Sequence, residues 1–547
     1  MNCTKKLYSN SHYLYFLLFF WAIIFSLEYL YRNGIPFFLC NDSFQYLSIA
    51  HKIYLSGKIN GATNYAIDIY YDEIALFGYD LSNIKPYHFP SYSIFLSLFY
   101  HIFENHNFVI YASQYIAFII FSFSSFLVLN QYLDKNKSLV ITLVTMVSTP
   151  IILYISDCGK EILLSGLSLL VFYFGLYHKN KYSLKVQFFL CFILTLMSIT
   201  RNFYLVLALL IFFYNCLPRK FLKIENSESE NRFKNNKQII LYFVLIFLIP
   251  LCAYIFCYYF LDLHLFIYDN RTDIYGGKSL KDLGLRVFFN LYIGVNYYFI
   301  QYIQFIFVDN FKIKNLNSLF HLYAMWGISI ITLGIYFLEE LKNIRTTRTL
   351  KISKLLIIKI FFGLIVFSVI VRFSLNGYRL TTGFMPIIYY YLYQKFFYGK
   401  KLIQKKFFIF FLIINIIFIA SFIKTSKHTA SYFDKLNQNI KNIISLYNAK
   451  KIALNVNYTP SPHLSPMYHY YSPNIYFFTS IVDKNLCEDL ANYHEHYLDF
   501  HLIFMGYGNK IIMNYSQNNC DFIIKNFELV DINQYGLVYA NKSILKR

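Results

Sequence analysis

Long apolar runs separated by short polar segments dominate the chain. A helix that crosses a bilayer needs about 20 predominantly apolar residues. Eleven runs reach or approach that length, and they lie near 13–31, 107–133, 138–156, 161–177, 186–200, 202–217, 238–261, 318–338, 355–373, 380–394 and 407–423. Several are short, so we expect some tilted or partly buried helices. The pattern predicts a polytopic α-helical membrane protein with about eleven transmembrane helices.

Basic residues between these runs set the expected orientation, because cytoplasmic loops carry an excess of lysine and arginine. One apolar run, 287–308, would break the alternation if it crossed, so we expect it to lie in the interface or to re-enter. The N-terminus is then cytoplasmic and the C-terminus extracytoplasmic. The basic blocks expected to be cytoplasmic are 5–6, 135–137, 179–185, 219–223, 345–354 and 400–406.

This topology predicts two domains. Residues 1–424 form a transmembrane domain, which includes a first outer loop at 32–106, a cytoplasmic linker at 218–237 and an outer loop with the interfacial segment at 262–317. Residues 425–547 alternate helix-like and strand-like patterns and predict a small extracytoplasmic α/β domain. Its expected helix is 435–447, and its expected strands are 451–456, 475–481 and 521–525.

Composition narrows the classes of function. The chain is 57% hydrophobic and only 14% charged, which excludes an ordinary soluble protein. The formal net charge of +21 falls in blocks between apolar runs, so the orientation rule explains it and we expect no nucleic-acid partner. The nine cysteines contain no CxxC pair, which argues against a zinc framework. The joint excess of Phe, Tyr, Ile, Asn and Lys fits A/T-rich codons and suggests an A/T-rich bacterium, which favours the inner membrane as the location, with the endoplasmic reticulum as the alternative.

Polar residues gather at the ends of runs expected on the outer side. Asp42 follows the first run and begins a helix-like stretch in which Tyr46 and Ala50 share its face at four-residue spacing. An ionisable group at membrane depth is costly, so each such group needs a partner or a function. The other polar segments expected on this side are 85–92, 156–161, 200–202 and 376–379.

This set of residues resembles the GT-C fold glycosyltransferases that use polyprenyl-phosphate sugars, among them protein O-mannosyltransferases and aminoarabinose transferases of lipid A. Their first outer loop carries an Asp followed by Tyr and Ala, as Asp42, Tyr46 and Ala50 do here. A small outer C-terminal domain adds to the likeness. The remaining matches are a Pro-rich entry at 85–92, an acid opening a later helix at Glu161, Thr200-Arg201 between short helices, and Arg379 shortly before Pro386.

The resemblance implies an integral-membrane enzyme that moves a sugar from a polyprenyl-phosphate donor to an acceptor hydroxyl, with inversion. Asp42 would be the general base. Arg201 and Arg379, and after them Lys85, would bind the donor phosphate, because fixed cations stabilise the charge that the leaving phosphate gains.

Tyr46, His88 and Glu161 would position substrate. The implied partners are the lipid-linked sugar, membrane lipid and an acceptor glycan, lipid or protein.

Three departures from the family pattern limit what the resemblance implies. Ser43 stands where many relatives have a second acid, so we expect no metal or other cofactor and do not favour a divalent ion. Asn202 replaces the usual Pro after Thr-Arg, and the entry segment lacks a double Pro. The sugar, the acceptor and the lipid carrier therefore do not follow from the resemblance.

Simpler interpretations stay open at each position. Asp42 could serve only as a helix N-cap. Arg201 and Arg379 could neutralise Asp157 or Glu161, or extend to the interface. Lys85 could be an ordinary solvated lysine.

Alternatively, the protein could be a transporter or flippase for polyprenyl-linked glycans, or a polymerase or ligase that uses the same lipid carrier. We see no internal repeat of the kind that transporters show.

Overall fold

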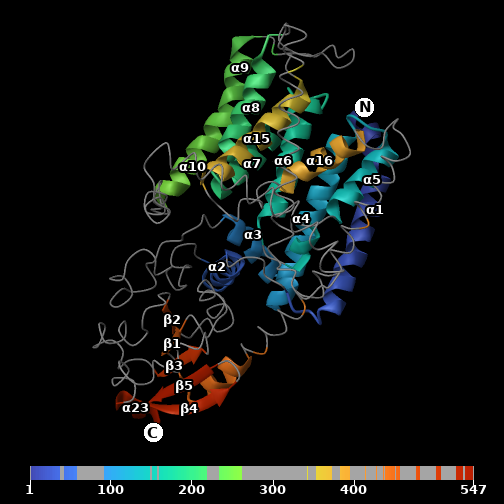
Figure 1. The fold of residues 1–547 in the computed structure, drawn as a ribbon. Helices are drawn as coiled ribbons and strands as arrows, with labels where there is room; N and C mark the ends of the chain where they lie inside the picture. The colour runs from blue at the N-terminus through green and yellow to red at the C-terminus, as the bar shows by residue number, and fades with distance from the viewer. Residues whose placement is uncertain are drawn as a thin grey trace. The chain divides into compact units, whose positions relative to one another are not determined.

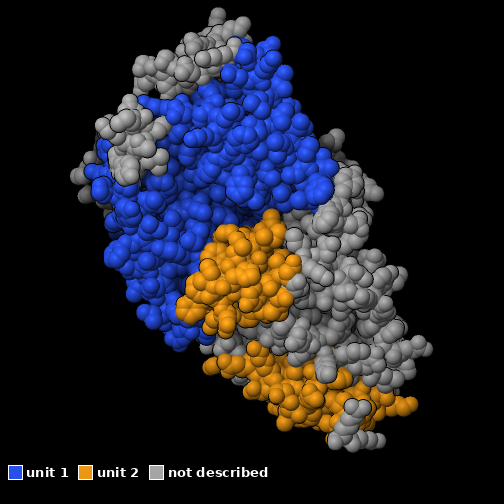
Figure 2. Space-filling model, turned by 180° about the vertical axis from the view of Figure 1, so that it is seen from behind, with its two compact units in different colours: residues 1–36, 110–427 blue, residues 37–109, 428–547 orange. Residues whose placement is uncertain are grey.

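A computed structural model gives the structure of the chain. It describes residues 2–36, 42–57, 91–147, 151–156, 159–218, 235–260, 353–372, 382–394, 438–449, 451–455, 476–480, 501–506, 525–533 and 536–545, together with the single positions 233, 342, 413, 427 and 435. The chain divides into two units, drawn in different colours in Figure 2. Unit 1 comprises residues 1–36 and 110–427, and unit 2 comprises residues 37–109 and 428–547.

In its described residues, unit 1 consists of helices joined by turns (Figure 1). Its α-helices are α1 (Asn2–Tyr31), α4 (His106–Leu129, whose first turn belongs to unit 2), α5 (Lys135–Met146), α6 (Glu161–Phe172), α7 (Leu184–Thr200), α8 (Tyr204–Cys216), α9 (Asn236–Phe243), α10 (Ile249–Phe260), α15 (Lys354–Arg372) and α16 (Met385–Leu392). Ile151–Ser156 form a 3₁₀-helix, and Tyr173–Tyr177 and Val244–Leu248 form π-helices.

Three helices in the described part of the chain are long and apolar enough to cross a membrane: Ser11–Tyr31, His106–Leu129 and Asn236–Cys257. They match the predicted runs at 13–31, 107–133 and 238–261. Shorter apolar helices occupy Glu161–Tyr177, Leu184–Thr200 and Tyr204–Cys216, where the sequence predicts short spans. The predicted runs at 318–338 and 407–423 and the interfacial run at 287–308 lie outside the described residues, apart from Ile413.

Two prolines explain where the helices depart from single continuous spans. The predicted run 138–156 is not one helix: α5 ends at Met146 and a 3₁₀-helix follows from Ile151. Pro150 lies between them and has no amide hydrogen to continue a helix. Pro250 in the first turn of α10 likewise cannot donate to the carbonyl four residues earlier, and the π-helix Val244–Leu248 ends just before α10.

The helices of unit 1 pack through aromatic and small residues. The Trp21 indole of α1 donates to the Ser122 hydroxyl of α4 over 3.1 Å, and its ring lies 4.8 Å from that of Phe118. Gly166 of α6 lies so close to α4 that a Cβ there would be 2.7 Å from the backbone nitrogen of Phe121. Small residues of this kind allow helix backbones in membranes to approach one another closely.

Asn215 links three helical segments through its side-chain amide. Its Nδ2 lies 3.0 Å from the Gly175 carbonyl of the π-helix and 3.0 Å from the Tyr242 hydroxyl of α9, and its Oδ1 accepts from Tyr182 over 3.2 Å. Asn215 is buried, so these contacts satisfy an amide that would otherwise be costly there. They join α8 to α9 and to the end of α6.

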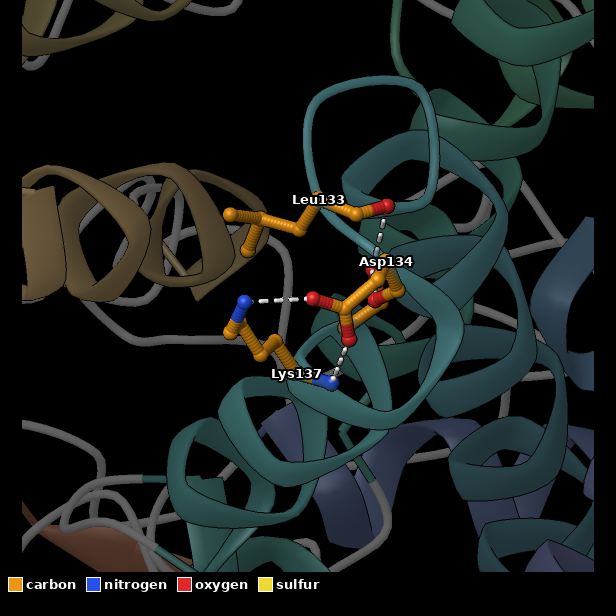
Figure 3. A network of polar contacts seen from close by, with 4 residues as sticks. Leu133, Asp134 and Lys137 are labelled. Atoms are coloured by element: carbon orange, nitrogen blue, oxygen red, sulfur yellow. Dashed lines mark hydrogen bonds and ion pairs between the residues drawn. The ribbon is translucent and has the colours of Figure 1, made fainter. Parts of the chain in front are cut away.

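The start of α5 shows an exposed helix cap (Figure 3). The Asp134 carboxylate accepts from the Lys137 amide over 2.9 Å and pairs with the Lys137 ammonium over 2.6 Å. The side-chain hydrogen bond from Lys137 lowers the pKa of Asp134. The Ser138 hydroxyl donates back to the Asp134 carbonyl over 2.9 Å. The carboxylate thereby satisfies the Lys137 amide, one of those that the first turn leaves without a helical partner.

Unit 2 combines a helix pair with a mixed sheet. Helices α2 (Asp42–Ser56) and α3 (Ser91–Tyr100) pack against each other. In its described residues the sheet has the order β2-β1-β3-β5-β4, with β1 parallel to β2 and β3, and β5 antiparallel to β3 and β4. The strands are β1 (Lys451–Asn455), β2 (Tyr476–Ser480), β3 (Leu502–Gly506), β4 (Phe527–Asn533) and β5 (Gly536–Asn541), followed by the short helix α23 (Lys542–Leu545).

The strands β1 and β2 lie where the sequence predicts them. Of the strand predicted at 521–525 only Lys525 is among the described residues, and it is helical, whereas β4 begins at Phe527. Pairing with β5 explains where β4 begins, because Phe527 is opposite Asn541 in the antiparallel ladder of these two strands. Unit 2 groups residues 37–109 with residues 428–547, and the sequence-based division into 1–424 and 425–547 stays a prediction.

The rings of His51, Tyr100 and His106 belong to three different helices of unit 2 and lie close together. The His51 ring of α2 lies 4.7 Å from that of His106 at the start of α4 and 5.2 Å from that of Tyr100 on α3. His106 Nδ1 is 3.0 Å from the Tyr100 hydroxyl. Burial lowers the pKa of His51. Lys441 is close enough to interact electrostatically with His106.

We expect Gly166→Ala to destabilise the protein by about 1–3 kcal/mol, because the added methyl group meets the α4 backbone rather than a movable side chain. Gly363→Ala on α15 is the matched control. Nothing lies within 4 Å of its added Cβ, and alanine favours a helix over glycine by about 0.5–1 kcal/mol. Thermal unfolding of the purified protein in detergent measures both. Equal changes in the two variants would contradict the close approach of α4 and α6.

We expect acidification to destabilise unit 2 through His51. A lowered folded-state pKa means that the unfolded chain binds the proton more tightly, so stability is full above about pH 6.5 and falls as the pH falls toward 5. Protonation would also place a charge beside His106, which itself interacts with Lys441. The thermal unfolding temperature is measured between pH 5 and pH 8, roughly the range in which imidazole titrates. It should depend less steeply on pH in His51→Phe than in the wild type. The control variant His12→Phe on α1 should keep the pH dependence of the wild type. An unchanged pH dependence in His51→Phe would exclude His51 as its origin.

Candidate functional site

Two consecutive charged residues are buried where α6 begins. Lys160 is 3% exposed and Glu161 is 4% exposed, and both follow the buried Gly159. Glu161 occupies the first turn, where an acid interacts favourably with the helix dipole. Burial of an ionised group is nevertheless costly unless a counter-charge accompanies it. The partner of Glu161 therefore decides what this site can do.

Arg201 is that partner. Its Nη2 lies 3.0 Å from Oε1 of Glu161. Arg201 is the C-cap of α7 and has extended backbone angles, so it breaks the apolar run between α7 and α8. Its side chain keeps 27% of its surface exposed, whereas that of Glu161 keeps 3%. The guanidinium thus contacts a buried acid, while part of the Arg201 side chain keeps exposed surface.

Packing around the α7–α8 turn holds this arginine in place. The Arg201 amide donates to Met197 over 2.8 Å, and its carbonyl accepts from the Tyr204 amide over 3.1 Å. Tyr204 is buried, hydrogen-bonds to the Ser168 side chain on α6 and interacts electrostatically with both Arg201 and Glu161. Its ring centroid lies 6.1 Å from that of Phe361 on α15. The turn is therefore tied to α6 and α15.

A buried glutamine fixes the turn that precedes α6. Gln114 of α4 is fully buried, and its Nε2 donates to the Gly159 carbonyl over 3.1 Å. Gly159 directly precedes Lys160 and Glu161, so this hydrogen bond helps to set where α6 begins. An amide in an apolar helix costs free energy unless it is hydrogen-bonded, which makes Gln114 a specific constraint on the turn.

A second contact on the same face of α6 involves a distant segment. Ser165 lies four residues after Glu161, which places the two side chains one above the other on the helix. Its hydroxyl is 2.6 Å from that of Thr382, and both residues are buried. Thr382 precedes α16, and Arg379 comes three residues earlier in the sequence. Glu161 and Ser165 therefore hold Arg201 and Thr382, respectively, on one face of α6.

The other predicted site residues are described only in part. Asp42 is the first residue of α2, which fits both a helix cap and a base at a helix end. Tyr46 is buried, with its ring centroid 5.2 Å from that of Tyr92, and Ala50 is buried too. Lys85, His88 and Arg379 lie outside the described residues.

Sequence reasoning missed several residues of this region. Gln114, Ser165 and Thr382 were not singled out, and Lys160 appeared only as part of the polar segment 156–161. Each is a polar residue within or beside an apolar run, and that signal alone could have marked them. A further, partly buried ion pair joins Glu28 to Arg32 at the end of α1. Its four-residue spacing on one helix is visible in the sequence.

Metal binding finds no support in the described part of the chain. No group of three or more His, Cys, Asp or Glu side chains there could hold a metal ion. This statement does not extend to the histidine-rich segment 494–501, of which only His501 is described.

Comparisons with known proteins identify the fold. No family model matches the chain, and no curated protein sequence matches it. The structure of ArnT from Cupriavidus metallidurans bound to undecaprenyl phosphate is similar, with a TM-score of 0.55 and 10% identity over 98% of this chain and 99% of that one. ArnT in the apo state gives a TM-score of 0.48 at 9% identity, over 98% and 99% of the two chains.

An oligosaccharyltransferase from Archaeoglobus fulgidus, tethered to an acceptor peptide, gives a TM-score of 0.47 at 12% identity. That match covers 97% of this chain and 74% of the other. The likeness to the undecaprenyl phosphate complex of ArnT extends over nearly the full length of both chains. The chain therefore has the GT-C fold, and this prediction from the sequence is confirmed.

We expect the Glu161–Arg201 pair to be strongly coupled in stability. Arg201→Met removes the counter-charge of a buried acid and should cost about 3 kcal/mol or more, whereas the double variant Glu161→Gln/Arg201→Met should be less destabilised than Arg201→Met alone. A double-mutant cycle on thermal unfolding measures the coupling.

The exposed Asp134–Lys137 pair provides the matched control for that cycle. Its two side chains are 53% and 47% exposed, so water screens their interaction and the same cycle should give a much smaller coupling. Additive effects of Glu161→Gln and Arg201→Met would contradict the buried ion pair.

Proposed function

We propose that this protein is an integral-membrane glycosyltransferase that moves a sugar from a polyprenyl-phosphate donor to an acceptor hydroxyl at the outer face of the membrane. The observation that carries the proposal is Arg201, an arginine fixed by a buried acid at a helix junction while part of its side chain stays exposed. The GT-C fold adds support, because the ArnT structure with the same fold contains undecaprenyl phosphate.

Arg201 suits a phosphate ligand on chemical grounds. A guanidinium has five N–H donors, and the ion pair engages Nη2 with Oε1 of Glu161. The remaining donors can bind phosphate oxygens, and their planar arrangement allows two parallel hydrogen bonds. Arg379 and Lys85 complete the proposed phosphate site. These cations favour the transition state over the bound donor, since negative charge on the phosphate grows as the sugar bond breaks.

Asp42 is the proposed general base. The acceptor oxygen attacks the anomeric carbon from the side opposite the phosphate and forms the new glycosidic bond. Its proton passes to the Asp42 carboxylate, and the bond from the anomeric carbon to the phosphate oxygen breaks, with the electron pair leaving on the polyprenyl phosphate. This displacement inverts the anomeric carbon. Tyr46 and His88 position the substrate in this proposal, and Glu161 does so by orienting Arg201.

The proposal includes a topology and a location. The chain crosses a bacterial inner membrane about eleven times, with its N-terminus in the cytoplasm and its C-terminal α/β domain outside. In α1 the large apolar side chains Phe16, Phe19 and Leu27 are exposed, which suits a helix that faces lipid. The acceptor is a hydroxyl of a glycan, a lipid or a protein.

Asp42→Asn is expected to lower transfer by about 10²–10⁴-fold, because the amide cannot take the acceptor proton. The assay uses the purified protein in nanodiscs with polyprenyl-phosphate sugars and a mixed acceptor pool. Asn caps a helix about as well as Asp does, so the variant should unfold at nearly the wild-type temperature. It thereby separates a catalytic Asp42 from a purely capping one.

The control is Asp134→Asn at the exposed cap of α5, which should keep both transfer and stability. Transfer at the wild-type rate in Asp42→Asn would refute the general-base role. Loss of folding in that variant alone would favour a structural role.

A further inference from the structure

Tyr204 is a buried tyrosine to which the proposed chemistry assigns no role. It is 7% exposed and opens α8, three residues after Arg201. Its amide donates to the Arg201 carbonyl over 3.1 Å, so the two residues belong to one turn of the chain. Its side chain also interacts electrostatically with Arg201 and with Glu161. A phenol thus lies beside the buried ion pair.

The Tyr204 hydroxyl attaches this turn to α6. It hydrogen-bonds to the Ser168 side chain. The Ser168 hydroxyl donates to the Leu164 carbonyl over 2.7 Å, so its oxygen accepts from the phenol. Ser168 lies seven residues after Glu161, which is close to two helical turns and puts both side chains on one face of α6, about 10 Å apart along the axis. The turn is therefore attached to α6 at two points, Arg201 to Glu161 and Tyr204 to Ser168.

The Tyr204 ring attaches the same turn to α15. Phe361 is fully buried there, and its ring centroid lies 6.1 Å from that of Tyr204 and 5.5 Å from that of Phe203. Phe361 also contacts Phe172 at the end of α6, with centroids 5.6 Å apart. Aromatic pairs prefer particular relative orientations. Phe361 therefore constrains how the first turn of α8 lies against the other two helices.

Two attachment points fix an orientation that the ion pair alone leaves open. A single contact between Nη2 of Arg201 and Oε1 of Glu161 allows the guanidinium plane to rotate about it. Phosphate binding by arginine depends on that plane, because its N–H groups form a rigid fork that matches phosphate oxygens two at a time. Anchoring Tyr204 fixes the backbone that carries Arg201 and so limits the rotation.

We infer that Tyr204 is a positioning residue, whose hydroxyl and ring dock the α7–α8 junction on α6 and α15 and thereby hold the guanidinium of Arg201 in the orientation that binds the donor phosphate. This inference rests on the proposed function, in which Arg201 binds that phosphate. The charge of the phosphate site comes from Arg201, and its geometry depends on Tyr204. Tyr204 touches no substrate in this scheme, and Ser168 and Phe361 act through it.

The test uses Tyr204→Phe, which removes the hydroxyl and keeps the ring, in the full chain in nanodiscs. The probe is undecaprenyl phosphate. Its dissociation constant should rise by about three- to tenfold, because misorientation of the fork should cost about as much as one hydrogen bond. Ser168→Ala should have a similar effect, and Tyr204→Phe/Ser168→Ala should bind about as weakly as either single variant, since both changes remove the same bond. Partial unfolding would instead lower the number of binding sites at an unchanged dissociation constant, and that result would overturn the inference.

Arg201→Lys separates orientation from packing. A lysine keeps a positive charge beside Glu161 but has no planar fork to orient. Adding Tyr204→Phe to Arg201→Lys should therefore leave the dissociation constant of the probe at its Arg201→Lys value. A further loss as large as the one that Tyr204→Phe causes in the wild type would overturn the inference, since Tyr204 would then act on the site by another route.

The ring contact has a test of its own. Phe361→Leu keeps an apolar side chain but removes the ring that Phe203 and Tyr204 contact, and it should also weaken binding of the probe. Phe118→Leu on α4 is the matched control, because Phe118 is equally buried and packs on Trp21 with centroids 4.8 Å apart. Equal affinities in the two variants would contradict the part assigned to the ring.

Two further variants are matched controls for the lost hydroxyls. Tyr242→Phe removes a fully buried phenol hydroxyl that accepts from Asn215 over 3.0 Å, and Ser125→Ala removes a hydroxyl bonded within its own helix, as that of Ser168 also is. Both should bind the probe like the wild type, and weaker binding in them as well would overturn the inference.

The failure of the proposed function has a different signature. A wild-type protein that does not bind undecaprenyl phosphate would overturn the phosphate role of Arg201, and the inference with it. Binding by the wild type that Tyr204→Phe leaves unchanged would overturn the inference alone.

Discussion

The cost of burying a charge in an apolar surrounding is the constraint on which the rest of the site depends. Glu161 is almost wholly buried at the start of α6, and its ionised form needs a cation beside it. That requirement fixes Arg201, and Arg201 in turn fixes where α7 ends and α8 begins. One ion pair thus holds the short junction between the apolar helices α7 and α8 against α6. The same cost explains why Gln114 and Asn215 make specific hydrogen bonds inside the helical unit.

Close packing of α6 allows these polar contacts to form. Gly166 brings the α6 backbone against Phe121 of α4, and α4 also carries Gln114, which bonds the turn before α6. On another side Ser168 meets Tyr204 of α8, and Ser165 meets Thr382. Helix association in a membrane gains little from the hydrophobic effect, so small residues and hydrogen bonds decide which helices touch. Small and hydroxylated residues of α6 serve that purpose here.

The sequence predicted the features that depend on local pattern. Apolar length located α1, α4 and the helical segment 236–257, and the Thr200-Arg201-Asn202 break located the α7–α8 junction. The one-to-one pairing of Arg201 with Glu161 remained an open alternative, because Asp157 was an equally good partner by position. The Ser165–Thr382 bond was out of reach, since no local pattern links residues so far apart. The start of β4 was out of reach for the same reason, because it depends on the pairing of Phe527 with Asn541 on a different strand.

The pairing of Arg201 with an acid also bears on product release in the proposed reaction. The donor phosphate is a diester with one negative charge, whereas the departing polyprenyl phosphate is a monoester whose charge approaches two at neutral pH. A site built from unopposed arginines would bind the product more tightly than the donor, and release would then limit turnover. Glu161 offsets part of the charge of Arg201 while keeping its guanidinium in place. In the proposed reaction the acid would therefore moderate the affinity of the site for the more highly charged product while keeping the fixed donors that stabilise the transition state.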